Sequence, residues 1–269
     1  MKFLFSIVML LAVHAVCAQE LFVFAEPASN MPAHSISAKV TGRIPLSAAK
    51  RGLQRYSPEI MFGLNKNLMI HATGFVSNFY QKSIQPEAIR LYGKYRFVSV
   101  DEVHKHFRMA AYAGASYSKN PFRYEDINLA GDNSGIEAGL IATQLVNRFA
   151  VSLTAGYLQV GKRPEMHLPS PDRKAIEYTL STGYLIFPKQ YTSFSQPNLN
   201  IYLEAIGMQG LERGGKMLDL APSLQLILNS NLKINAAYRF QVLGEMHRIA
   251  EKGVFISLER TFLGALRRK

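Results

Sequence analysis

Residues 232–242, Leu-Lys-Ile-Asn-Ala-Ala-Tyr-Arg-Phe-Gln-Val, alternate apolar and polar side chains along the chain. Because strand side chains point alternately to the two faces of a sheet, Leu232, Ile234 and Tyr238 fall on one face and Lys233 and Arg239 on the other. Two architectures share this pattern, namely a soluble barrel with an apolar interior and a membrane barrel with an apolar exterior.

The same alternation recurs along the whole chain and predicts twelve strands. Most of them are long enough to cross a hydrocarbon layer at a tilt, which takes about 9–11 residues, whereas strands in soluble domains are usually about five or six residues long. Strand length therefore favours the membrane barrel. The expected strands are 34–46, 56–64, 67–79, 86–100, 106–118, 133–146, 149–162, 175–189, 198–212, 217–228, 232–246 and 253–264.

The connections between these strands alternate in length. Every second one is short, as at 65–66, 147–148 and 229–231, and the intervening ones, such as 119–132 and 163–174, are mostly longer. Barrels of the outer-membrane type have short periplasmic turns and longer extracellular loops. The pattern therefore predicts an all-β, transmembrane, antiparallel up-and-down barrel of about twelve strands, with both termini at the periplasmic end.

The polar faces of the expected strands carry charges of both signs, as a water-filled lumen would require. Arginine, lysine and carboxylate side chains that face one another in a narrow channel are expected to pair across it. The opposite faces carry apolar residues such as Val40, Leu140 and Leu258, which form a continuous belt suited to lipid. The residues assigned to the lumen, where they would set solute selectivity, are Lys39, Arg43, Glu59, Arg90, Lys94, Arg96, Arg108, Glu137, Glu177, Glu204, Asp219, Lys233, Arg239 and Glu259.

The first eighteen residues read as a cleavable signal peptide. Lys2 precedes an apolar run, and Val16-Cys17-Ala18 supplies small residues for cleavage before Gln19. We therefore divide the chain into a signal peptide at 1–18, a periplasmic N-terminal segment at 19–33, a barrel at 34–264 and a basic periplasmic tail at 265–269. Whether the segment 19–33 enters the lumen as a plug is left open.

The formal charge of +12 is spread over loops and one strand face. Because it forms no continuous basic stripe, nucleic acid is not expected as a partner. The basic residues of the longer connections, including Arg55, Arg123, Arg213 and Arg248, are expected to be solvated, with contact to lipopolysaccharide phosphates as the functional alternative.

The pattern resembles the single-chain outer-membrane β-barrel proteins of Gram-negative bacteria that are described as porins or transporters. The segment Glu26-Pro-Ala-Ser-Asn-Met-Pro32 before the first strand is similar to the start of such proteins, and Phe262 stands near the end of the last strand. The resemblance implies an outer-membrane location and recognition of the last strand by the barrel assembly machinery. Residues Leu263 to Lys269 continue beyond the aromatic residue, which departs from the usual pattern.

Candidate catalytic and metal-binding groups are few. His71 and Ser77 share a strand face but are six residues apart, roughly 20 Å along a strand, which is too far for a dyad. His167, Ser170 and Asp172 lie in a proline-rich loop, for which a rigid loop is the preferred interpretation. His104 and His106 lie beside Asp101 and Glu102 in a short turn, and a solvated turn is preferred there over a metal site.

We therefore expect no enzyme activity, no cofactor and no bound metal. The sequence predicts a narrow channel for passive movement of small polar solutes through the outer membrane. Two alternatives remain open, a closed structural or lipopolysaccharide-binding barrel and, less favoured, a lipid-modifying outer-membrane enzyme. The expected partners are outer-membrane lipid, lipopolysaccharide, the barrel assembly machinery and small polar solutes.

Overall fold

The computed structural model describes residues 22–46, 52–161, 172–190, 193 and 195–267. The expected signal peptide at 1–18, His167 and Ser170 lie outside these residues, as do the last two residues of the expected tail. Twelve antiparallel strands form a closed barrel in which β1 pairs with both β2 and β12. The predicted all-β, up-and-down barrel is confirmed.

The strand bounds differ from the predicted ones by at most two residues at either end. The turn between β6 and β7 places Asn147 at a φ of 54°, and the turn between β10 and β11 places Asn229 at 49°. Asparagine tolerates this left-handed backbone better than most residues, which explains why such short turns work here. The strands are β1 (Ser35–Pro45), β2 (Arg55–Gly63), β3 (Leu68–Ser77), β4 (Gln85–Glu102), β5 (Lys105–Ser118), β6 (Gly135–Val146), β7 (Phe149–Val160), β8 (Lys174–Phe187), β9 (Asn198–Gly210), β10 (Lys216–Leu228), β11 (Leu232–Gly244) and β12 (Lys252–Phe262).

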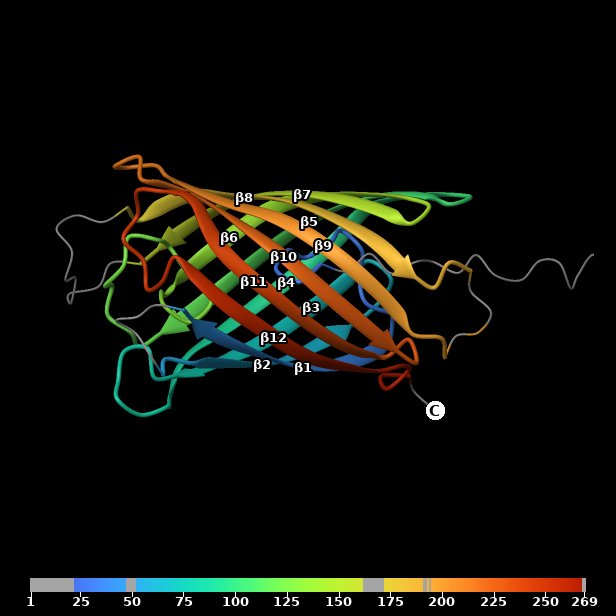
Figure 1. Cartoon of the computed structure of the whole chain (residues 1–269), viewed down its shortest axis with the longest axis horizontal. Helices are drawn as coiled ribbons and strands as arrows, with labels where there is room; N and C mark the ends of the chain where they lie inside the picture. Colours follow the sequence, from blue (N-terminus) through green and yellow to red (C-terminus); the bar gives the residue numbers. More distant parts are fainter. Residues whose placement is uncertain (1–21, 47–51, 162–171, 191–192, 194, 268–269) are drawn as a thin grey trace, which may run out of the picture.

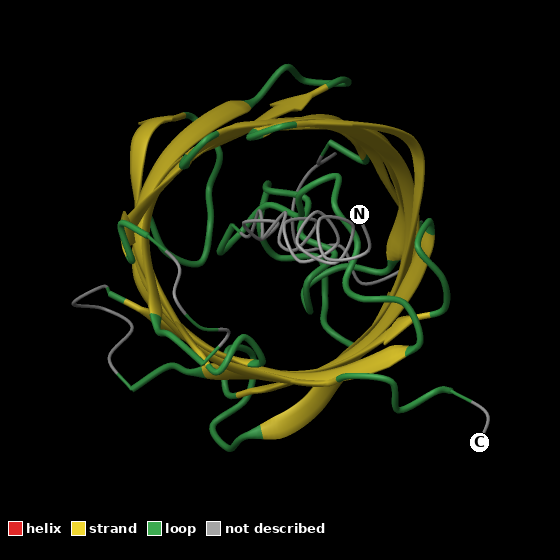
Figure 2. Cartoon of the chain, turned by 90° about the vertical axis from the view of Figure 1, so that its right-hand side faces the viewer, coloured by secondary structure: helices red, strands yellow, loops and turns green. Residues whose placement is uncertain are grey.

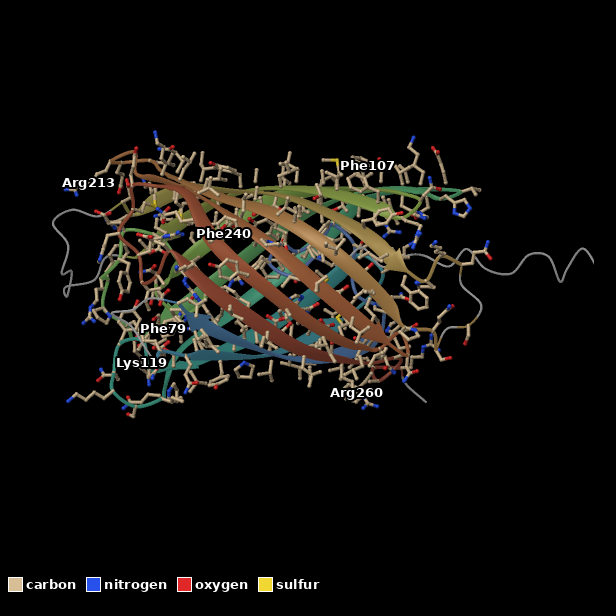
Figure 3. All side chains as sticks on the ribbon, in the orientation of Figure 1. Phe79, Phe107, Lys119, Arg213, Phe240 and Arg260 are labelled. Atoms are coloured by element: carbon tan, nitrogen blue, oxygen red, sulfur yellow. The ribbon has the colours of Figure 1, made fainter. Side chains whose placement is uncertain are left out.

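The two ends of the barrel differ (Figure 1). One end, which we call the turn end, carries the short turns at 103–104, 147–148 and 229–231 and the C-terminal residues. The other, the loop end, carries the longer connections, including 78–84, 119–134 and 245–251. Side chains of Lys119 and Arg213 mark the loop end in Figure 3, and those of Phe107 and Arg260 mark the turn end.

The outer surface of the barrel is an apolar belt. Leu140 and Leu258 each expose 53% of their surface, and Leu153 exposes 55%. Their neighbours along each strand point inward and are mostly polar and buried, so the burial pattern alternates residue by residue. The apolar faces of the strands therefore point outward, which is the arrangement expected of a membrane barrel and the reverse of a soluble one.

The barrel interior is occupied by segments of the chain itself, seen inside the ring of strands in Figure 2. Residues 22–33 pack in the half nearer the turn end, where Phe22 contacts Tyr202 and lies in a cluster with Leu145 and Ala150. The connection 119–134 folds back into the half nearer the loop end, where Ile127 and Leu129 are buried. No helix in the described part of the chain is long and apolar enough to cross a membrane.

Candidate functional site

A buried carboxylate holds the first described residues of the N-terminal segment in the lumen. Glu204, on β9, accepts hydrogen bonds from the backbone amides of Val23, Phe24 and Ala25 at 3.0, 3.0 and 2.8 Å. It also accepts one from the Ser181 hydroxyl at 3.1 Å, and its surface is fully buried. Three consecutive backbone amides therefore replace the water that this carboxylate would otherwise need.

A buried lysine holds the next residues of the same segment. The Lys94 ammonium donates to the carbonyl oxygens of Pro27 and Ser29 at 2.6 and 2.8 Å and pairs with Glu26 at 3.1 Å. Thr143 accepts a hydrogen bond from the Ala28 amide at 2.9 Å. The segment 22–29 is thus fixed to the barrel wall through both its donors and its acceptors.

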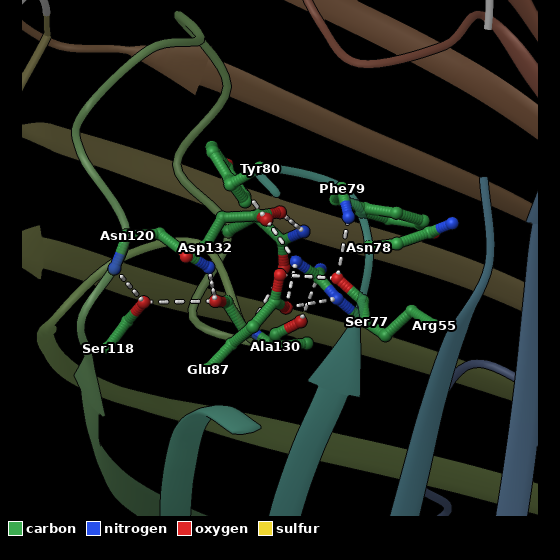
Figure 4. A network of polar contacts seen from close by, with 12 residues as sticks. Arg55, Ser77, Asn78, Phe79, Tyr80, Glu87, Ser118, Asn120, Ala130 and Asp132 are labelled. Atoms are coloured by element: carbon green, nitrogen blue, oxygen red, sulfur yellow. Dashed lines mark hydrogen bonds and ion pairs between the residues drawn. The ribbon is translucent and has the colours of Figure 1, made fainter. Parts of the chain in front are cut away.

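The connection 119–134 is fixed by an arginine on the wall, as Figure 4 shows. The Arg55 guanidinium donates to Glu87 at 2.9 and 3.1 Å and to Asp132 at 2.5 Å, and its surface is only 2% exposed. It also donates to the Ala130 carbonyl oxygen at 3.0 Å, and Tyr80 donates to Asp132 at 3.0 Å. Arg55 therefore joins β2, β4 and the connection in one buried network.

A second arginine fixes the connection 245–251. Arg248 donates to both oxygens of Asp219, at 2.7 and 2.8 Å, and to Gln241 at 2.6 Å. Asp219 accepts a further bond from Arg239 at 2.7 Å. Both Arg55 and Arg248 were expected in solvated loops, and this expectation is wrong. The connection 119–134 folds inward and buries Arg55 against Glu87 and Asp132, and the connection 245–251 folds inward and buries its own Arg248 against Asp219.

Between the N-terminal segment and the inward connections lies a cavity of about 400 Å³, which we call the chamber. Its lining comes from strands all around the barrel and includes charged groups of both signs and several aromatic rings. The charged lining residues are Glu26, Lys39, Arg43, Arg55, Glu59, Arg90, Asp126, Glu137, Glu177, Asp219, Arg239, Arg248, Glu251 and Lys252.

On one wall of the barrel, the strand register brings four charged residues together in a row, and two of them line the chamber. Lys233, Glu259, Lys39 and Glu59 stand side by side on β11, β12, β1 and β2. Lys233 donates to Glu259 at 2.8 Å, and the Lys39 ammonium lies 3.8 Å from Glu59. Cross-strand neighbours of opposite charge stabilise a sheet, so this row ties together the strands that close the barrel.

The opposite wall, formed by β6, β7 and β8, carries two carboxylates and two glycines that leave room for a tyrosine. Glu137 on β6 pairs with Arg90 at 2.5 Å, and Glu177 on β8 accepts a hydrogen bond from Tyr112 at 2.9 Å. A Cβ atom at Gly139 or Gly156 would collide with the Tyr112 side chain. Because these two glycines have no side chain, the Tyr112 ring can lie over β6 and β7 and donate its hydrogen bond to Glu177.

Asp126 projects from the inward connection to the chamber lining. Burial, with a further contribution from the Asp132 carboxylate, raises the pKa of Asp126 to about 6. The charge of the chamber therefore changes near neutral pH.

The structure places the predicted lumen residues in three groups, and Arg96 stands apart from them. Lys39, Arg43, Glu59, Arg90, Glu137, Glu177, Asp219 and Arg239 line the chamber. Lys94 and Glu204 hold the N-terminal segment, and Arg108 contacts it, donating to Ser29 at 2.8 Å. Lys233 and Glu259 lie in the row of charges, and Arg96 is half-buried beside a β-bulge between β4 and β5.

Sequence reasoning missed Arg55, Glu87, Asp132 and Arg248, which fix the inward connections. The charge of Arg55 and its position just before the expected strand 56–64 were visible, but the fold of 119–134 into the lumen was not. His71 was considered only for a dyad with Ser77. It lines the chamber with its Nδ1 atom 3.9 Å from Glu59, while the Ser77 hydroxyl donates to Glu87.

The histidines of the turn at 103–104 do not act together. His106 lies 2.6 Å from Asp101, which also accepts a bond from Arg108 at 3.0 Å, whereas His104 has a φ of 60° at the turn itself. Within the described ranges, no group of three or more histidine, cysteine or acidic side chains has the geometry to hold a metal ion.

Known proteins were compared with this chain by sequence and by structure. No family model and no curated protein matches the sequence. A KdgM porin matches the structure with a TM-score of 0.51 and 11% identity, covering 84% of this chain and 99% of that protein. This chain has the fold of a porin barrel.

Other solved barrels match with lower scores. The β domain of the Bordetella autotransporter BrkA has a TM-score of 0.46 at 11% identity and covers 85% of this chain and 98% of its own. Salmonella typhi OmpF has a TM-score of 0.37 at 11% identity and covers 85% and 96%. At 11% identity, the match to the KdgM porin establishes the fold alone.

Proposed function

We propose that this protein is a narrow outer-membrane channel for the passive movement of small polar solutes. The observation that supports the proposal is the chamber of about 400 Å³. It lies inside the barrel and is lined by charged residues of both signs. A polar chamber inside a barrel with an apolar exterior is what a solute path through a membrane requires.

The apolar belt supports the placement in a membrane. Leu140, Leu153 and Leu258 expose more than half of their surfaces on the outside of the barrel, where water would oppose them and lipid would not. In the proposed arrangement this belt contacts outer-membrane lipid, the loop end meets lipopolysaccharide, and the assembly machinery reads the last strand at Phe262.

The lining predicts weak charge selectivity. Basic groups such as Arg90 and Arg239 are paired with Glu137 and Asp219, so neither sign dominates the path. Barrels of about eight strands are filled by side chains and those of about sixteen have an open channel, so twelve strands fit a small solute. In this proposal, the paired residues narrow the path and hold its electrostatics in place.

Single-channel recording of the purified barrel in a planar bilayer tests the proposal, with the reversal potential taken under a salt gradient. A steady conductance smaller than that of large porins, with weak ion preference, is expected. A barrel that migrates as folded before heating and as unfolded after heating, yet carries no current, overturns the channel.

That result would favour a closed, ligand-binding barrel. A specific observation supports this second candidate, since the lumen is entered from both ends by protein. Residues 22–29 are fixed by Glu204 and Lys94 near the turn end, and residues 119–134 are fixed by Arg55 near the loop end. Binding of lipopolysaccharide or another ligand without ion flow would then describe the protein.

A further inference from the structure

Arg43 and Glu177 are two groups of opposite charge that line the chamber and have no ion-pair partner among the described residues. Arg43, on β1, has no carboxylate oxygen of the described chain within 4.0 Å, and its guanidinium instead lies 5.7 Å from the ring centre of Phe79 and 5.6 Å from that of Phe255. Glu177, on β8, has no cation within 4.0 Å in the same part of the chain and accepts a hydrogen bond from Tyr112 alone. Both side chains line the chamber.

These two groups stand on opposite walls. In the closed strand order, β1 and β8 are five strands apart in one direction and seven in the other. Arg43 lies two residues from the loop-end terminus of β1 at Pro45, and Glu177 lies three residues from the loop-end terminus of β8 at Lys174. An unpaired cation and an unpaired carboxylate therefore face the same space from nearly opposite sides, in the same half of the barrel.

Apart from Asp126, Glu251 and Lys252, the other charged residues that line the chamber each have an ion-pair partner in the described part of the protein. Arg90 is paired with Glu137, Lys39 faces Glu59, and Arg239 shares Asp219 with Arg248. Glu251 and Lys252 are exposed at the loop end, where water hydrates them. Asp126 is a third group without an ion pair, and it projects from the inward connection instead of the barrel wall.

We propose that the chamber is a binding site for small zwitterions that carry a carboxylate and an ammonium group at opposite ends. The solute's carboxylate would accept hydrogen bonds from Arg43, its ammonium would donate to Glu177, and its aliphatic part would contact the Phe255 and Tyr112 rings. A volume of about 400 Å³ is at the lower end of the range of about 300–1,000 Å³ for small-molecule sites. This inference deepens the proposed channel function and rests on it.

The physical reason is the cost of removing charges from water. A simple anion at Arg43 would leave Glu177 unpaired in the same chamber, and a simple cation at Glu177 would leave Arg43 unpaired. A zwitterion of the right length satisfies both groups at once, so it gains two ion pairs while its own charges are neutralised.

The test is the reduction of single-channel current by a series of ω-amino acids, namely glycine, 4-aminobutyrate and 6-aminohexanoate. Butyrate and butylammonium are the singly charged controls. We expect at least one member of the series to reduce the current at a concentration ten-fold below that needed for either control. The length at which this happens measures the span between the two groups.

Variants separate the two contacts. Arg43→Gln and Glu177→Gln are each expected to remove the ten-fold advantage of the zwitterion, and Glu177→Gln keeps an acceptor for Tyr112. Arg260→Gln is the matched control, because Arg260 is exposed on the outside of the barrel and lies over the Phe262 ring at 5.7 Å. Equal effects of zwitterions and singly charged controls on the wild-type current would overturn the inference while leaving the channel proposal intact.

Calorimetric titration of the refolded barrel with the same solutes covers the case of no current. In that case the absent current would already have overturned the channel, and preferential binding of a zwitterion would support the chamber as the site of a closed, ligand-binding barrel. Absence of any preference would overturn the site as well.

Discussion

The contact between Glu204 and the N-terminal segment can be broken without removing any backbone hydrogen bond between the strands of the barrel wall, although the Ser181 hydroxyl also loses its acceptor. In the variant Glu204→Leu, the amides of Val23, Phe24 and Ala25 lose their acceptor, while a buried side chain of similar size remains. Hydrogen bonds to charged groups contribute about 1.5–3 kcal/mol each, so at the lower end the three together hold the segment by about 4.5 kcal/mol. At about 1.4 kcal/mol per factor of ten, the docked state should lose about three factors of ten in its equilibrium.

Hydrogen–deuterium exchange of the peptide covering 22–31 measures this loss directly. Exchange of these amides is governed by local release of the segment, so we expect it to become about 1,000-fold faster in Glu204→Leu. Exchange in β8 and β9 should change little, because their ladder bonds are intact. If the segment closes the path, the variant should also show a larger single-channel conductance.

Two further variants provide the controls. Ser181→Ala removes one hydroxyl from the same carboxylate and leaves all three amide contacts, so exchange of 22–31 should increase only a few-fold. Glu204→Gln keeps one carbonyl oxygen as an acceptor and should fall between the two. Unchanged protection of the segment in Glu204→Leu would refute the view that this carboxylate holds it.

Three other expectations follow from the same contacts. Arg55→Leu leaves Glu87 and Asp132 buried without their cation and should lower the free energy of unfolding by about 3–5 kcal/mol in a denaturant titration, whereas Arg123→Leu, on an exposed arginine, should change it little. The Asp126 carboxyl, with a pKa of about 6, is neutral at pH 4.5 and charged at pH 7.5. Reversal potentials should therefore show an anion preference that falls as the pH rises through 6, and Asp126→Asn should reduce this pH dependence. An unaltered pH dependence in Asp126→Asn would assign it to another group. Leu258→Arg, in the middle of the belt, should destabilise the barrel in bilayers by about 2–4 kcal/mol and Leu263→Arg, beyond the last strand, by about 0–1, so equal costs would contradict the proposed membrane position.

The sequence was sufficient for the strands because each one carries its own signal. Alternation in residues such as 232–242 requires only the geometry of an extended chain, and the belt follows from the same parity. The same reasoning placed Arg43, Glu177 and Glu204 on the inner face, since the direction of a strand side chain depends on its own position and not on a distant partner.

Ion-pair partners could not be assigned in the same way, because they depend on register. Lys39 stands beside Glu59 and Glu259 only because β1 pairs with β2 and β12 in one particular alignment. A shift of one residue would have moved these charges to the outside, and no local pattern fixes the alignment at the closure between β1 and β12.

The sequence by itself determined the twelve strands, their inner and outer faces and the alternation of turns and loops, because these are properties of local periodicity. Only the tertiary structure decided what fills the lumen. Residues 22–29 and 119–134 have no periodic pattern, and their positions depend on Glu204, Lys94 and Arg55, which lie far away along the chain. The chamber, which both Arg43 and Glu177 line, exists only because these segments enter from opposite ends and leave the space between them unfilled.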